Sequence, residues 1–319
     1  MKTANFPFHS TLFFKGIGLA AFLLVGTAAC TSTVDPYHQR IAKLNVQEKG
    51  EDAYTRDKIA NLPPEELTEK GLAYLNQGSL ELARLHFSAA LQKKPDATAA
   101  LAGLGQVFLA RGSTPQAREI FTTVLEKDPQ NMAAQLGLAR IARSQGDYPT
   151  AQNLLEKLQA NYPETPVVIS ELAITYDSIG QDKLGFAELL HQKFISLRPD
   201  NPSGYNNLGF NYLLQGRYTD AIPLFSRALA LEPANMRSKN NLATAFLLNN
   251  QEVRALQLFE DTLGKPAAYN NIGYLYMTQG NWDKAEKAFK KALELNPVFY
   301  PRAQQNLDRL NSLRSQSAQ

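Results

Sequence analysis

Pairs of asparagines recur in the C-terminal half of this chain of 319 residues. The pairs are Asn206-Asn207, Asn240-Asn241 and Asn270-Asn271, and a single Asn306 follows them. An amide side chain both donates and accepts hydrogen bonds, so a row of amides could bind the main chain of an extended peptide whatever its sequence. The alternative is that asparagine is simply common at one position of a repeated structural unit.

Patterns that support catalysis or metal binding are absent from the sequence. The closest approach to a phosphate-binding loop is Gly103-Leu104-Gly105, which we interpret as a packing position on a helix. No serine or cysteine has the sequence context of a nucleophile. The histidines lie far apart, at His9, His38, His86 and His191. This spacing favours surface or packing roles over metal binding. We therefore predict a protein that is not an enzyme and that carries no cofactor or metal.

The only cysteine, Cys30, follows an apolar segment near the N-terminus. Residues 1–16 contain Lys2 and Lys15 but no acid, and residues 17–29 are apolar and end in small side chains, which is typical of a secretory signal. The segment is shorter than the about 20 apolar residues of a transmembrane helix. It resembles the signal of bacterial lipoproteins, in which the cysteine is lipidated. An ordinary signal peptide is the alternative.

The lipoprotein resemblance implies that residues 1–29 are removed and that Cys30 becomes the lipidated N-terminus. Thr31 follows the cysteine, and by the sorting habit of these proteins this implies an anchor at the periplasmic face of the outer membrane. A soluble periplasmic protein is the alternative. The polar, charged residues that follow predict a flexible tether over 30–63.

The composition of the remaining chain excludes some protein classes. Without the signal, 31 Lys and Arg (33 − 2) face 30 Asp and Glu, a net charge of +1. This balance gives no electrostatic signature of a nucleic-acid-binding protein. No cysteine remains for an intramolecular disulfide, so packing alone must hold the fold. The chain that remains is longer than one compact core usually holds, which indicates two domains or a repeating array.

Regularly spaced alanines favour the array. They are separated by 34, 34, 36, 34, 34 and 30 residues, and a proline follows twelve residues after each one except Ala255. The alanines are Ala83, Ala117, Ala151, Ala187, Ala221, Ala255 and Ala285. The predicted units are 64–97, 98–131, 132–165, 166–201, 202–235, 236–265 and 266–299. Residues 300–319 are predicted to form a capping helix and a tail.

The fifth unit shows what the recurring residues of each unit do. Leu208 and Tyr212 share one helix face. Gly216 ends that helix, because glycine adopts a positive φ at little energetic cost. Gly209 lets the second helix approach closely, and Pro223 is predicted in or near the first turn of that second helix. Each unit is therefore an antiparallel helix pair, which must stack on its neighbours to bury its apolar faces.

This pattern resembles the tetratricopeptide repeat, which has the same period. The resemblance implies an all-α solenoid of antiparallel helix pairs that winds into a right-handed superhelix, with the first helices lining a concave groove. It places the asparagines, and nearby apolar side chains including Leu213, Leu247 and Met277, on that groove. The predicted peptide-binding residues are Asn206, Asn207, Phe210, Asn240, Asn241, Asn270, Asn271, Tyr274 and Asn306. In the third unit, Arg140 and Arg143 could receive an acidic segment or could simply be solvated.

A narrower resemblance covers Ser203 to Asn250, the shortened sixth unit, and residues 267–307. These stretches, together with the lipoprotein signal, resemble TadD, the tetratricopeptide lipoproteins of the tight-adherence (Tad, or Flp) pilus system. The resemblance implies a scaffold that helps to assemble or localise a pilus secretin, with the secretin or another pilus component as its partner. The alternatives are an adaptor for peptidoglycan enzymes, an outer-membrane assembly factor and a type IV pilotin.

Overall fold

The computed structural model describes residues 59, 61–296 and 301–317. The predicted signal, Cys30 and most of the predicted tether lie outside this part of the chain. The described residues form helices and no strand, and consecutive helices pack on each other along the whole array. The predicted all-α solenoid of helix pairs is therefore confirmed.

Each predicted unit contains one pair of helices. The pairs are α3 (Pro64–Asn76) with α4 (Leu80–Lys93), α5 (Thr98–Ala110) with α6 (Thr114–Lys127), α7 (Met132–Ser144) with α8 (Tyr148–Asn161), α9 (Pro166–Ile179) with α10 (Leu184–Leu197), α11 (Pro202–Leu214) with α12 (Tyr218–Leu231), α13 (Met236–Leu248) with α14 (Glu252–Leu263), and α15 (Lys265–Thr278) with α16 (Trp282–Leu295). A final helix, α17 (Pro301–Ser317), packs on α16 and α15.

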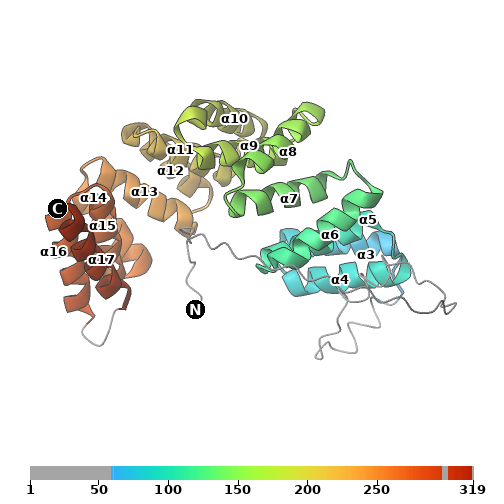
Figure 1. The fold of residues 1–319 in the computed structure, drawn as a ribbon, viewed down its shortest axis with the longest axis horizontal. Coiled ribbons are helices and arrows are strands. Elements are labelled where there is room, and N and C mark those ends of the chain that lie inside the picture. The colour runs from blue at the N-terminus through green and yellow to red at the C-terminus, as the bar shows by residue number, and fades with distance from the viewer. Residues whose placement is uncertain (1–58, 60, 297–300, 318–319) are drawn as a thin grey trace, which may run out of the picture.

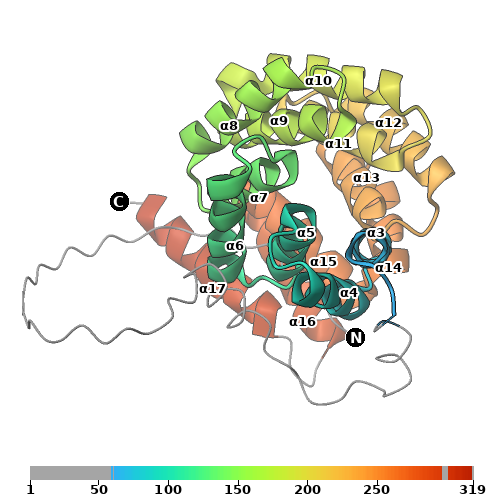
Figure 2. The same cartoon turned by 90° about the vertical axis from the view of Figure 1, so that its right-hand side faces the viewer.

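The pairs follow an arch (Figure 1). It runs from α3 and α4 at one end, through α9, α10 and α11 at the top, to α15, α16 and α17 at the other end. In the view turned by 90°, the path also coils out of the plane, with the N-terminal helices in front of the C-terminal ones (Figure 2). Neighbouring first helices contact one another from α3 to α13, and α15 contacts α17, whereas neighbouring second helices make no comparable contacts, so the first helices lie on the inner side of the curve.

Close approach within each pair depends on small residues. All seven recurring alanines are fully buried. In the fifth unit, a Cβ added to Gly209 would lie 2.8 Å from Cε1 of Phe225, which is itself fully buried. The predicted close packing of these two helices is therefore confirmed. Gly216, with φ of 76°, ends α11, and Asn250 takes the same left-handed role in the sixth unit with φ of 57°.

Two units depart from the common geometry. In the fourth unit, Gly180 has φ of 98°, and a short 3-10 helix, η1 (Gln181–Lys183), precedes α10. In the sixth unit, α14 ends at Leu263 and α15 begins at Lys265, so that Gly264 alone joins them with φ of 82°. By contrast, the longer segment 232–235 joins α12 to α13.

Three sequence predictions need correction. Pro223 lies inside α12 as its sixth residue, beyond the first turn. Ile59 in the predicted tether is only 6% exposed, because it covers apolar side chains of the first unit. Helix α17 continues to Ser317, so most of the predicted tail is helical.

Candidate peptide-binding groove

The nine predicted groove residues all lie on first helices or on α17. Asn206, Asn207 and Phe210 are on α11, Asn240 and Asn241 on α13, Asn270, Asn271 and Tyr274 on α15, and Asn306 on α17. Their side chains, however, do not all have the same surroundings. The amides divide into a buried set that joins neighbouring units and a half-buried set that borders the inner surface.

Asn206 belongs to the buried set, with 6% of its surface exposed. Its Oδ1 accepts from Nδ2 of Asn241 at 3.0 Å and from Oγ of Ser238 at 3.1 Å, both in the next unit. Its Nδ2 donates to Oδ1 of Asn207 at 3.3 Å. Asn206 therefore ties the fifth unit to the sixth.

Asn270 repeats this arrangement two units later. It is 3% exposed, and its Oδ1 accepts from Nδ2 of Asn306 on α17 at 2.9 Å. The prediction that Asn206 and Asn270 extend an open polar strip therefore needs correction, because both amides are buried between units. Buried polar groups must be paired, and these asparagines pair with other asparagines.

The hydrogen bond that joins asparagines of neighbouring units is missing between the sixth and seventh units. Oδ1 of Asn240 is buried without a hydrogen-bond partner, and Asn271, which stands where Asn241 and Asn306 do, does not reach it. The one-residue link at Gly264 lies at this step, and α13 and α15 do not pack on each other as closely as the other neighbouring first helices do. We call the asparagine side chains that join neighbouring units along α11, α13, α15 and α17 the amide ladder. It is therefore interrupted at the shortened sixth unit.

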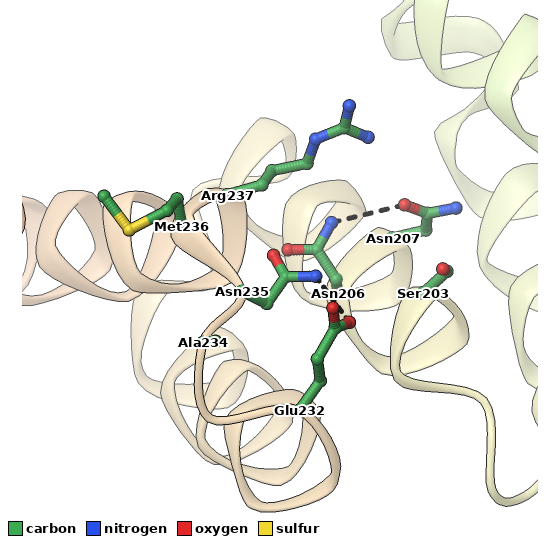
Figure 3. A pocket seen from close by; sticks show the side chains of 8 residues that line it. All are labelled: Ser203, Asn206, Asn207, Glu232, Ala234, Asn235, Met236 and Arg237. Carbon is green, nitrogen blue, oxygen red and sulfur yellow. Dashed lines mark hydrogen bonds between the residues drawn. The ribbon is translucent and has the colours of Figure 1, made fainter. Parts of the chain in front are cut away.

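A pocket of about 350 Å³ opens where α11 meets α13 (Figure 3). Asn207 borders it from α11, and Arg237 borders it from α13. Within the described part of the chain, the guanidinium of Arg237 and the amide nitrogen of Asn207 have no hydrogen-bond partner. Glu232, which also lines the pocket, accepts from Nδ2 of Asn235 at 2.8 Å. The pocket thus offers unused donors that suit a carboxylate or a main-chain carbonyl.

The charge of the first helices changes along the array. Helices α11, α13 and α15 contain no Asp or Glu, and their charged residues are Arg237, Lys239 and Lys265. Helix α3 at the other end carries Glu65, Glu66 and Glu69. The acids of the last three units lie instead on second helices or in the connecting segments. The first helices of these units therefore carry no negative side chain that would repel a carboxylate of a ligand.

Apolar side chains complete the inner surface of the fifth unit. Phe210 is 42% exposed and Leu214, one turn later, is 44% exposed. Leu213 of the same unit and Tyr274 of the seventh unit are half-buried. The predicted apolar pockets at Leu247 and Met277 are wrong, because these side chains are only 3% and 5% exposed and belong to the core.

The two arginines of the third unit are half-buried and already have a carboxylate partner within the chain. Nε of Arg140 lies 2.7 Å from Oε1 of Glu171, and Nη1 of Arg143 lies 2.8 Å from Oε2 of the same carboxylate. Arg143 also donates to Oγ1 of Thr175 at 3.1 Å. Both sequence interpretations therefore need correction: the pair joins the third unit to the fourth. Glu171, close to one repeat period after Arg140, was the signal that sequence reasoning missed.

The described histidines have structural partners. Nδ1 of His86 lies 2.8 Å from the carbonyl of Leu82, and Nε2 of His191 lies 2.8 Å from Oδ2 of Asp177. Among the described residues, no three His, Cys, Asp or Glu side chains are grouped as metal ligands. Among the described helices, none has the length and hydropathy of a membrane span.

Models of the tetratricopeptide repeat match residues 68–131, 108–173, 202–235 and 266–299. The chain belongs to the tetratricopeptide repeat family. Proteins of this family generally act as scaffolds that bind other proteins or peptides, so the inner surface described above is the place to seek a partner. No curated protein matches the sequence.

Solved tetratricopeptide repeat structures share the fold at low sequence identity. A protein from Parabacteroides merdae is 19% identical, with a TM-score of 0.53 over 77% of this chain and 98% of its own. PilF of Pseudomonas aeruginosa is 21% identical, with a TM-score of 0.51 over 68% of this chain and 97% of its own. The Cut9-Hcn1 assembly of APC/C gives 16% identity and a TM-score of 0.56 over 88% of this chain and 63% of the compared one. At these levels of sequence identity, the similarity shows that the fold is shared and nothing more.

Proposed function

We propose that this tetratricopeptide repeat protein is a non-enzymatic scaffold that holds an extended segment of a partner polypeptide on the inner surface of units five to seven. The observation that carries the proposal is the combination found there. The half-buried Asn207 has an unused amide donor and lies one turn before the exposed Phe210 on α11, and the first helices of these three units carry no acid. A peptide main chain supplies carbonyls for such donors, and an apolar side chain of the partner would cover Phe210.

The pocket between α11 and α13 adds a preference for charge. Arg237 and Asn207 offer donors to the same space, and the carboxylate of Glu232, which keeps its charge while it accepts from Asn235, lines it from the other side. We therefore expect a carboxylate or carbonyl of the partner to lie there, because charge-assisted hydrogen bonds are stronger than neutral ones. The partner segment would then present an acceptor oxygen to Arg237 and would carry at least one apolar residue.

Photo-crosslinking from the groove tests this proposal. A benzophenone amino acid placed at position 210 should capture a defined polypeptide in the intact cell envelope. The matched control places the same amino acid at position 186, since Phe186 is 58% exposed but lies on a second helix. Capture from position 186 of the same chain with equal yield would argue against the inner surface as the binding site.

Replacing Asn207, Asn241 and Asn271 together by alanine should weaken the captured complex about tenfold. Each substitution removes an amide N–H that can face a ligand, since Asn241 uses only one of its two N–H groups on Asn206. A tenfold change in Kd corresponds to about 1.4 kcal/mol. The measurement is the Kd of the purified variant for the captured segment, with circular dichroism as a control for helix content. An unchanged Kd with unchanged helix content would show that these amides do not bind the partner.

The lipid anchor at Cys30 is part of the same proposal, and it rests on the signal-like sequence before this cysteine. Cys30→Ser should release the protein from the membrane fraction into the soluble periplasmic fraction, because stable anchoring needs the acyl chains of the lipidated cysteine. The measurement is fractionation of cell envelopes. A variant that stays with the outer membrane would refute the anchor.

The resemblance to TadD supports a role in assembling or localising the secretin of a Tad pilus. The alternative is an adaptor for a peptidoglycan enzyme, an outer-membrane assembly factor or a pilotin of a type IV pilus. The identity of the chain captured from position 210 separates them. A secretin or another pilus component would favour pilus assembly, and a cell-wall hydrolase or synthase would favour the adaptor.

A further inference from the structure

Helix α10 exposes two large apolar side chains on the outer side of the array. Phe186 is 58% exposed, and Leu189, one turn later, is 64% exposed. They flank the recurring Ala187. In units two, three, six and seven, both equivalent positions carry exposed polar or charged side chains. An exposed apolar pair on an otherwise polar outer surface is typical of an interaction site.

The ring of Phe186 already has fixed neighbours within the fourth unit. It meets the ring of Tyr176 on α9 edge-on, with 6.3 Å between the ring centroids. Nζ of Lys183 in η1 lies 5.3 Å from the centroid of Phe186 and 5.1 Å from that of Tyr176. A side chain that is held in this way loses little conformational freedom when a partner covers it.

Opposite charges stand at the two ends of this exposed face. Asp182 in η1 lies one turn before the apolar pair, and Lys193 lies one turn after it. Because positions 182, 186, 189 and 193 are four, three and four residues apart, they share one helix face. Asp182 is exposed and forms no ion pair within the described part of the chain. Nζ of Lys193 donates to the carbonyl of Pro163 at 2.9 Å and lies 3.8 Å from Glu164, and 38% of its side chain is exposed.

The order of these four side chains is complementary to itself. In an antiparallel pair of identical helices, residues equally distant from the twofold axis lie opposite each other. The midpoint between Phe186 and Leu189 is also the midpoint between Asp182 and Lys193. One register therefore places Phe186 of each copy on Leu189 of the other, and Asp182 of each copy opposite Lys193 of the other. Such reciprocal contacts are what a twofold interface requires.

The position of α10 lets a second copy reach it. In both views α10 lies at the top of the arch, on the side away from the first helices (Figures 1 and 2). Gly185, next to Phe186, is exposed, and a Cβ at this position would meet nothing within 4 Å, so another helix can approach closely. A contact through α10 would also leave the inner surface of units five to seven open.

We infer that the outer face of α10 is a self-association surface, on which a second copy of this chain packs antiparallel about a twofold axis. Apolar contacts between Phe186 and Leu189 supply the burial, and Asp182 with Lys193 fixes the register. The face is smaller than the about 20–30 residues a side of a standard interface. We therefore expect a reversible dimer with a Kd in the micromolar range.

Sedimentation equilibrium of the mature chain carrying Cys30→Ser tests this surface. The wild-type face should give a monomer–dimer equilibrium, and Leu189→Asp should raise the Kd at least tenfold, because it places a carboxylate against the ring of Phe186 of the other copy. Gln257→Asp is the matched control, since Gln257 is exposed at the equivalent position of the sixth unit and should leave the Kd unchanged. Circular dichroism checks that both variants keep their helix content. A chain that stays monomeric at all concentrations, or a dimer that Leu189→Asp does not weaken, would overturn the inference.

An exchange of charges tests the antiparallel register. At low ionic strength, Asp182→Lys alone should raise the Kd about tenfold, because it sets two lysines opposite each other. Adding Lys193→Asp to the same chain should return the Kd close to that of the unchanged face, since each lysine again meets an aspartate. A double variant that dimerises no better than Asp182→Lys would contradict this register and the inference with it. In cells, a benzophenone amino acid at position 186 should capture a second copy of this chain, and capture of a different protein in its place would also speak against the dimer.

Discussion

Gly137→Ala is expected to lower the free energy of unfolding by about 2 kcal/mol, because it overpacks a buried contact between two units. Gly137 lies on α7, and a Cβ at this position would be 2.2 Å from Cε2 and 2.3 Å from Cζ of Phe121. The ring of Phe121 is fully buried and is also approached by Gly105, so it has no room to move away. Overpacking of this kind costs about 1–3 kcal/mol. The better helix propensity of alanine opposes it by up to about 1 kcal/mol.

The chain offers a matched control for this effect. Gly185 is also helical, but it is exposed and a Cβ there would meet nothing within 4 Å. Gly185→Ala should therefore leave stability unchanged or raise it by up to about 1 kcal/mol. Urea unfolding followed by circular dichroism measures both variants. In a second test, adding Phe121→Leu to Gly137→Ala should cost less than the sum of the two single changes, since the smaller side chain makes room. Strict additivity would contradict the proposed steric cause.

The recurring alanines and prolines were sufficient to predict the helix pairs, because they reflect contacts inside one unit. The sixth position of the units was harder to interpret. It is glycine in units two and three and asparagine in units five to seven. The structure explains the glycines, since Gly103 faces Phe87 and Gly137 faces Phe121, in each case the phenylalanine of the preceding unit. A contact between units depends on the rotation from one unit to the next, which the period does not specify.

The same limit applies to the polar residues of the candidate site. Asn206 and Asn207 are neighbours of the same type, yet one is buried between units and the other borders the inner surface. Arg140 and Glu171 are separated by 31 positions and form an ion pair, while Asn206 and Asn241 are separated by 35 and share a hydrogen bond. No single spacing identifies these pairs. Sequence reasoning placed the asparagines on the correct helices but could not separate the structural amides from the accessible ones.

Asn206→Ala should destabilise the protein by about 1–3 kcal/mol, the usual cost of leaving a buried donor unpaired. The substitution removes the buried acceptor of Asn241 and Ser238, and the hydroxyl of Ser238, which is fully buried, would lose this partner. Asn207→Ala is the control, because Asn207 accepts only one bond, from Asn206 at 3.3 Å, and Asn206 also lines the pocket, where water can replace the lost acceptor. We expect that change to stay within about 0.5 kcal/mol.

A double-mutant cycle separates this structural role from ligand binding. Asn241→Ala alone should cost less than Asn206→Ala, because Ser238 would still donate to Asn206. The double variant should be more stable than the sum of the single losses predicts, since removing both amides leaves no broken pair between them. Urea midpoints of the three variants supply the coupling energy. A coupling of zero, with Asn206→Ala as mild as Asn207→Ala, would mean that the amide ladder does not hold the units together in solution.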